Sequence, residues 1–201
     1  TIREAGYIPT GKRGGGAIAM TAREAANMLI ALNGADMPKD CPVAIDRFRS
    51  LRQFFSGSSK DFTAYSASFD GQPEALQDVA DARTFGAALE SLIDGVPGLA
   101  VSFYNFAREQ FPTEGDGEYW ETHLLDAFSL NMFGVQIKFE RYSATIDLFI
   151  MHGSERCVQC EVRFTHDPDR DPSFYGRSWP DRRVQSTIGM RSLVAAWQAL
   201  N

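Results

Sequence analysis

The sequence predicts an α+β fold, in which a helical N-terminal part with a wing-like β-hairpin precedes an antiparallel β-meander packed with helices. Three observations predict it. Residues 22–32 carry apolar side chains at the three- and four-residue spacing of an amphipathic helix. Residues 135–164 contain three runs in which apolar and polar side chains alternate. The 201 residues are 44% hydrophobic and 23% charged, which is typical of a chain with a packed core.

The first twenty residues predict the hairpin. Thr1 to Ala5 are expected to end a helix, and Gly6 to terminate it, because glycine adopts positive φ without steric cost. Tyr7 to Pro9 and Ala17 to Ala19 flank a glycine-rich tip and are predicted as its two short strands. Pro9 has no backbone N–H to donate, so the first of them is expected to be an edge strand.

Two helices are predicted after the hairpin. Thr21 and Glu24 have the spacing of a capping box, and the helix that they start is expected to stop at Asn33-Gly34. A second helix is expected from near Pro42, because proline suits a first helical position. The apolar stripe of this second helix consists of Ile45, Phe48, Leu51 and Phe55.

A boundary is predicted near the end of the second helix. Residues 56–72 are rich in Ser, Gly and Asp and are predicted mostly as a loop. We therefore divide the chain into residues 1–56, which hold the hairpin and helices, and residues 73–201, an α+β domain with the meander. A third helical region is expected over about 74–94, before Gly95 and Pro97.

The meander is predicted because apolar side chains begin to recur at every second residue. Side chains of alternating polarity form three runs joined by short turns, which is typical of antiparallel strands with one buried face. The apolar members of these runs are Val135, Ile137, Phe139, Ile146, Leu148, Ile150, Val158, Cys160, Val162 and Phe164.

The remaining segments complete this expectation. Leu99 to Phe106 fits a strand or a helix, and Tyr119 to Leu130 is predicted as helical. Residues 166–183 are predicted as a long loop rich in Asp, Pro and Arg. Met190 to Leu200 carries the apolar stripe of a closing helix that packs on the sheet.

The charge is unevenly distributed. Residues 1–60 carry nine Lys and Arg against five Asp and Glu, a net +4, whereas residues 61–201 carry eleven against twenty-one, a net −10. The total of −6 argues against a protein that coats nucleic acid over its whole surface. An acidic body with a basic end is typical of a protein that touches an anion with one end only. The alternative interpretation is chance clustering of charge on solvated helix faces.

The composition also bears on location. No apolar run approaches the ~20 residues needed to cross a bilayer, and no basic-then-apolar leader is present. Cys41, Cys157 and Cys160 cannot all pair with one another. We therefore expect a cytoplasmic protein in a reducing environment.

The hairpin tip is the main candidate for a binding site. Lys12 and Arg13 would displace counterions from DNA, and Gly14, Gly15 and Gly16 have no side chains that keep the backbone away from a surface. The segment lacks the Gly-Lys-Ser/Thr of a nucleotide-binding loop, because Arg13 follows Lys12. The alternative interpretation is a hairpin tip with incidental charge.

The residues from Arg3 to Ala17, followed by Met20 to Leu32, resemble winged helix-turn-helix proteins, in particular uncharacterised ones of phage or prophage type. The resemblance covers about the first 35 residues. It implies the end of a recognition helix, a wing and the next helix. It also implies that Arg3, Lys12 and Arg13 occupy phosphate- or groove-contacting positions.

The long loop is a second candidate site. Aromatic and arginine side chains in one loop suit contact with a partner or a stacked base. The alternative is that these rings pack against the meander. The residues concerned are Phe174, Tyr175, Arg177, Trp179, Arg182 and Arg183.

No catalytic or metal motif is predicted. Cys157 and Cys160 would point to opposite faces of a strand and could not share a metal ion. The run from Asp167 to Asp171 fails as a calcium loop, because Pro172 replaces its required glycine. His123, His152 and His166 have no nucleophile at a recognisable spacing, so we expect no cofactor and no enzyme activity.

Together these observations favour a DNA-binding protein of phage or prophage type, a transcriptional regulator whose C-terminal domain oligomerises or binds a partner. The alternative is a phage assembly, packaging or host-inhibitor component that does not bind DNA by itself, which the acidic C-terminal part favours. A third possibility is an enzyme with a site between the sheet and the long loop.

Overall fold

The computed structural model describes residues 1–9, 20–59, 74–99, 101, 133–140, 142–152, 155–166 and 186–200. The prediction of an α+β fold is confirmed. In chain order the elements are α1 (Ala22–Gly34), a 3-10 turn (Pro38–Asp40), α2 (Cys41–Arg49), β1 (Arg52–Ser59), α3 (Glu74–Asp81), α4 (Phe85–Asp94), β2 (Phe133–Phe139), β3 (Ser143–His152), β4 (Glu155–Thr165), β5 (Ser186–Gly189) and α8 (Met190–Gln198).

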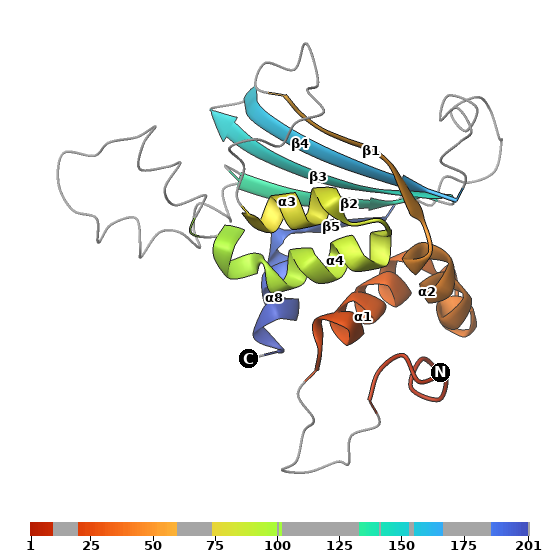
Figure 1. The fold of residues 1–201 in the computed structure, drawn as a ribbon. Coiled ribbons are helices and arrows are strands. Elements are labelled where there is room, and N and C mark those ends of the chain that lie inside the picture. The colour runs from red at the N-terminus through yellow and green to blue at the C-terminus, as the bar shows by residue number, and fades with distance from the viewer. Residues whose placement is uncertain are drawn as a thin grey trace.

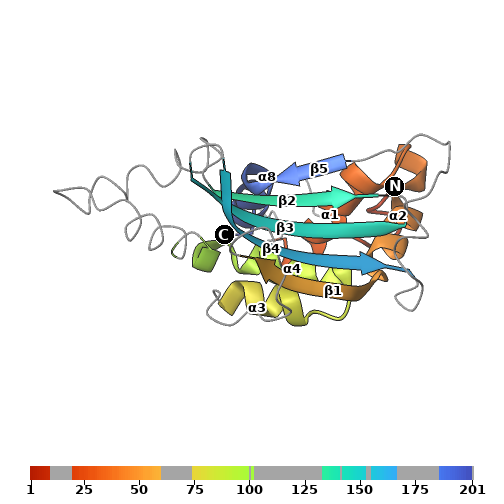
Figure 2. The same cartoon turned by 90° about the horizontal axis from the view of Figure 1, so that it is seen from above.

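The five strands form one antiparallel sheet in the order β1-β4-β3-β2-β5. The meander predicted from alternating polarity is confirmed as β2, β3 and β4, which are neighbours in the sheet. Figures 1 and 2 show the helices gathered on one face of this sheet. The alternation therefore buries one face of each central strand against the helical layer.

Aromatic rings join the helical layer to the sheet. Phe48 from α2 and Phe85 from α4 both pack edge-on against Phe139 of β2, with ring centroids 5.2 and 5.5 Å apart. Phe164 of β4 lies 5.6 Å from Phe85. All four side chains are buried. The N-terminal helices and the meander consequently share one hydrophobic core.

The second helix is shorter than predicted. It ends at Arg49, and Phe55, which was expected in its apolar stripe, lies in β1. Residues 56–59 were expected in a loop but belong to the same strand. The pairing partners of β1 lie in β4, as in Gln53 opposite Phe164. Residues 60–73, the rest of the predicted linker, lie outside the described part of the chain.

The third helical region is interrupted. It divides into α3 and α4, and the Thr84 hydroxyl caps α4 by accepting from the Ala87 backbone N–H at 3.3 Å. Residues at the interruption form backbone hydrogen bonds with residues at the start of β1. Gln53 N donates to Arg83 O at 3.1 Å, and Phe85 N donates to Leu51 O at 2.9 Å. This tertiary pairing competes with a continuous helix and explains the break.

The N-terminal turn follows the prediction closely. Ala5 N donates to Thr1 O at 3.1 Å, and Gly6 adopts φ +79°. Gly6 N then donates to Arg3 O, and Tyr7 N to Ile2 O, both at 3.0 Å, which is the Schellman pattern of a helix C-terminus. Tyr7 to Pro9, however, forms no strand, so that part of the hairpin prediction is wrong. Residues 10–19 lie outside the described part.

The C-terminal end contains a strand that the sequence analysis did not predict. β5 pairs with β2, with Ile188 opposite Ile137, and Gly189 leads directly into α8. The closing helix is confirmed, with Leu193 buried in the core. Leu99 belongs to a helical turn and is buried, whereas the predicted helix over residues 119–130 lies outside the described residues. Among the helices that the structure describes, none is long and apolar enough to span a membrane.

Candidate functional site

The predicted site residues are described only in part. Arg3 lies exposed on the N-terminal turn. The tip residues Lys12, Arg13, Gly14, Gly15 and Gly16, and the loop residues Phe174, Tyr175, Arg177, Trp179, Arg182 and Arg183, lie outside the described residues. The described chain nevertheless includes both ends of the segment that carries the tip, at Pro9 and at Met20.

The first end of this segment is bonded to α1. The Asn27 side-chain nitrogen donates to the Tyr7 backbone oxygen at 2.8 Å. The Asn27 oxygen accepts from Arg49 Nη1 at 2.9 Å, and Arg49 also pairs with Glu90 of α4. Asn27 is 3% exposed, so its amide is a buried polar group with partners on both sides. Three helices are therefore linked to the N-terminal turn through Asn27 and Arg49 in series.

A second contact joins the N-terminal turn to α2. The Asp46 carboxylate raises the pKa of the Tyr7 phenol above its ordinary value, chiefly through its capacity to accept the phenol proton. Burial and the negative charge of Asp46 add to the shift. Asp46 therefore lies close enough to Tyr7 to favour the protonated phenol.

The other end of the segment is fixed by the predicted capping box. Thr21 N donates to Glu24 Oε2 at 2.7 Å, and Glu24 N donates to Thr21 Oγ1 at 3.3 Å. The Thr21 hydroxyl also donates to Glu24 Oε2, at 2.9 Å. The capping box is thus confirmed, and it holds the chain where α1 begins.

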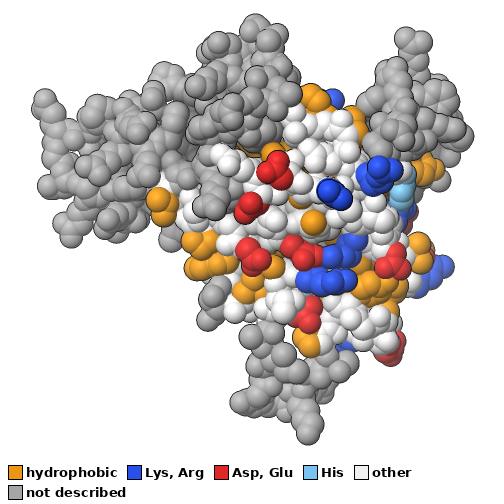
Figure 3. Space-filling view, in the orientation of Figure 1, with side chains coloured by type: hydrophobic (Ala, Val, Ile, Leu, Met, Phe, Trp, Pro, Cys, Tyr) orange, Lys and Arg blue, Asp and Glu red, His pale blue; other side chains and the backbone are white. Residues whose placement is uncertain are grey.

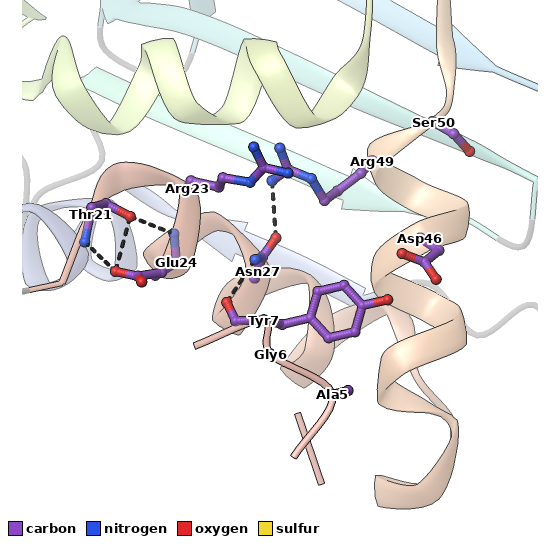
Figure 4. Close-up of a pocket in the computed structure, with 10 residues that line it drawn as sticks. All are labelled: Ala5, Gly6, Tyr7, Thr21, Arg23, Glu24, Asn27, Asp46, Arg49 and Ser50. Atoms are coloured by element: carbon purple, nitrogen blue, oxygen red, sulfur yellow. Dashed lines mark hydrogen bonds between the residues drawn. The ribbon is translucent and has the colours of Figure 1, made fainter. Parts of the chain in front are cut away.

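Both ends meet at one pocket of about 490 Å³ between the N-terminal turn, α1 and α2 (Figure 4). Tyr7 from the first end and Thr21 from the second both line it. The other lining residues are Ala5, Gly6, Arg23, Glu24, Asn27, Asp46, Arg49 and Ser50. The described residues on both sides of the segment of residues 10–19 are therefore held at the rim of one pocket.

Arg23 differs from the other charged residues of this pocket. Glu24 is engaged by the cap, and Arg49 by Asn27 and Glu90. Asp46 lies near the Tyr7 phenol, whose pKa it raises. Within the described part of the chain, Arg23 is exposed and has no ion pair or side-chain hydrogen bond. Figure 4 shows the Arg23 and Arg49 side chains extending toward each other across the pocket.

The described residues show little of the charge asymmetry of the sequence. Residues 1–9 and 20–59 carry six Lys and Arg against five Asp and Glu. On the face seen in Figure 3, basic side chains lie beside acidic ones. Most of the excess positive charge of residues 1–60 is therefore carried by Lys12, Arg13 and Lys60.

The polar face of the sheet is a second cluster of charges. Asp147 and Glu161 are opposed on β3 and β4, and both are buried. Lys138 Nζ lies 3.7 Å from Asp147, and Arg163 binds Glu161 through two hydrogen bonds of 2.7 and 2.8 Å. Each carboxylate has a cation, so the cluster is best explained as structural pairing.

The described residues hold no group of three metal-ligating side chains. Cys160 faces the core, and burial, with a further effect of Asp147, raises the pKa of its thiol to about 12. The thiolate is the reactive form of cysteine, so this thiol is not a nucleophile at neutral pH.

Sequence reasoning missed three residues of the pocket: Arg23, Asn27 and Arg49. One signal was present, because Asn27 is a polar residue between Ala26 and Ile30 on the buried side of α1. A polar side chain at such a position must find partners. Comparisons with protein-family models, with curated proteins and with solved structures found no match for this chain.

Proposed function

We propose that this chain binds duplex DNA through the basic segment of residues 10–19 and acts as a transcriptional regulator of phage or prophage type. Lys12 and Arg13 contact backbone phosphates, and Arg3 lies near the groove. The three glycines allow the backbone of the segment to approach the duplex closely. The C-terminal part forms an oligomer or binds a partner, through the loop that contains Phe174 and Trp179.

One observation supports this proposal most strongly: the two ends of the basic segment are held at the same pocket by Asn27 and by the Thr21 cap. A loop with fixed ends loses less conformational freedom on binding than a free chain end. The positive charge that attracts a polyanion is carried by Lys12 and Arg13 of the segment itself.

The test compares the parent chain with the double variant Lys12→Ala/Arg13→Ala, by measuring affinity for a random duplex between 50 and 200 mM salt. Each lost phosphate contact is expected to reduce the slope of log K against log salt by about 0.9, so the double variant loses about 1.8. Arg191→Ala is the matched control, since Arg191 is an exposed arginine of α8 at the other end of the chain.

An unchanged slope in the double variant contradicts this role of the tip. Absence of any duplex binding by the parent chain, together with a co-purifying protein, favours the alternative function of a protein-interaction component. Binding by the parent with a slope that the Arg191 control shares, and that falls by about 1.8 in the double variant, supports the proposal.

A further inference from the structure

We infer that the pocket at the base of the tip segment binds one phosphate group of the nucleic-acid backbone, with Arg23 as its main ligand and Arg49 as the second. This inference rests on the proposed function and adds a contact to it. The pocket-lining residues carry two cationic and two anionic side chains, so the balance between these charges decides whether a phosphate is attracted.

One of the two carboxylates of the pocket is already engaged. Glu24 accepts from both the backbone and the hydroxyl of Thr21, and a phosphate does not have to displace these donors. Asp46 lies near the Tyr7 phenol and offsets one of the two positive charges. All five N–H donors of Arg23, in contrast, are without a partner in the described residues.

Arg49 is the ligand of the proposed site whose orientation is fixed by other residues. Its ion pair with Glu90 and its hydrogen bond to Asn27 hold the guanidinium in one orientation. These contacts use two donor nitrogens once each, and a guanidinium carries five N–H groups, so donors remain. A phosphate in the pocket would therefore meet cationic side chains from both α1 and α2.

The position of the pocket fits a phosphate of the same duplex that the tip contacts. A ten-residue segment whose two flanks are both fixed can extend at most five residues outward, or about 17 Å. Along the axis of the duplex this distance covers about five phosphates of one strand, at about 3.4 Å of rise each. The tip and the pocket can therefore contact one strand within a few nucleotides of each other.

The experiment uses Arg23→Ala beside Lys12→Ala/Arg13→Ala and the Arg191→Ala control, with the same duplex and salt series. Loss of one phosphate contact reduces the salt slope by about 0.9, which changes the ratio of affinities at 50 and 200 mM salt by about 3.5-fold. Arg23 is exposed and has no partner in the described part of the chain, so the variant is expected to unfold at the same temperature as the parent.

The outcomes separate this inference from the proposed function. If the tip variant loses slope but Arg23→Ala matches the control, the pocket assignment is overturned and the function stands. If the parent shows no salt-dependent binding of duplex DNA, the proposed function fails.

Titration of the parent with inorganic phosphate, followed by the NMR signal of the Arg23 side-chain N–H, then tests the pocket alone. A saturable shift of the Arg23 signal, larger than that of the exposed Arg191 signal, supports a phosphate site. Absence of a shift, with an unchanged DNA slope in Arg23→Ala, overturns it. A shift with inorganic phosphate but an unchanged DNA slope overturns the assignment to the nucleic-acid backbone, and identifies a site for a free phosphate ligand.

Discussion

At the scale of single residues, Cys160 makes a testable contribution to stability. Its thiol has a pKa of about 12 in the folded chain, against about 8.5 when unfolded. Between these values the unfolded chain loses a proton that the folded chain keeps, so stability falls as pH rises. The contribution is complete below pH 8.5 and is lost progressively toward pH 12.

We expect the Cys160 thiol to account for about 2 kcal/mol of lost stability between pH 8 and pH 10. Urea unfolding of the parent and of Cys160→Ala at both pH values measures it. The variant is less stable throughout, because it leaves a small cavity, but its pH-dependent loss is smaller by this amount. An equal pH-dependent loss in parent and variant contradicts the assigned pKa.

The pocket shows how far single residues can be assigned from the sequence. Gly6 was correctly predicted at positive φ, because its role depends only on its own backbone. The Thr21 cap depends on residues three apart and was also predicted correctly. Asn27 and Arg49 act through partners that lie 20 and 41 residues away in sequence. Such pairs form only when the helices pack, so local spacing could not reveal them.

At the scale of elements, α1 presents two different faces. Ile30 is fully buried in the core, whereas Leu32, two residues later, is 71% exposed. The sequence analysis placed both in one apolar stripe, but residues two apart do not share a helix face. Replacement by alanine at each position therefore distinguishes the effect of burial on stability from the effect of helix propensity.

We expect Ile30→Ala to lower the free energy of unfolding by about 2–5 kcal/mol, because it empties a packed site. Leu32→Ala should change the same quantity by no more than about 0.5 kcal/mol. Urea denaturation of both variants with the parent provides the measurement. A large loss in Leu32→Ala would mean that the outer face of α1 is covered in solution, contrary to its exposure here.

The elements that were predicted and those that were missed differ in their source of stability. α1, α8 and the meander carry their own periodicity, and each was found. β1 and β5 were not found: β5 has only four residues, and β1 contains Phe54-Phe55-Ser56-Gly57, which does not alternate in polarity. Both are edge strands whose partners lie far away in sequence. Whether these residues form strands depends on the neighbouring strands with which they pair. A local sequence pattern carries no information about those partners.

At the scale of the whole molecule, the charge and the core are organised differently. Charge is divided along the sequence, since residues 1–60 carry a net +4 and residues 61–201 a net −10. The core is shared, because α1 and α2 contribute to the same cluster as β2, β3 and β4. A site at the basic end is therefore mounted on a scaffold that includes the sheet, which keeps the pocket geometry independent of the tip itself.

The shared core predicts that the N-terminal helices and the meander unfold together. Phe48 of α2 contacts the rings of both Phe85 and Phe139, so its removal weakens the junction between the helices and the sheet. We expect Phe48→Ala to cost about 3–5 kcal/mol, and Phe48→Leu a smaller amount that leaves the chain folded. Because one core connects the elements, the loss should appear equally in all of them.

Amide hydrogen exchange in increasing urea, followed separately for α1 and α2 and for β3 and β4, tests this expectation with Phe48→Leu. A common shift of all four elements indicates one cooperative unit. Arg191→Ala again serves as the surface control, with no shift expected. Earlier exchange of the helices while β3 and β4 remain protected as in the parent would instead mean that the N-terminal part and the α+β part are separate units, as the division at residues 56–73 predicts.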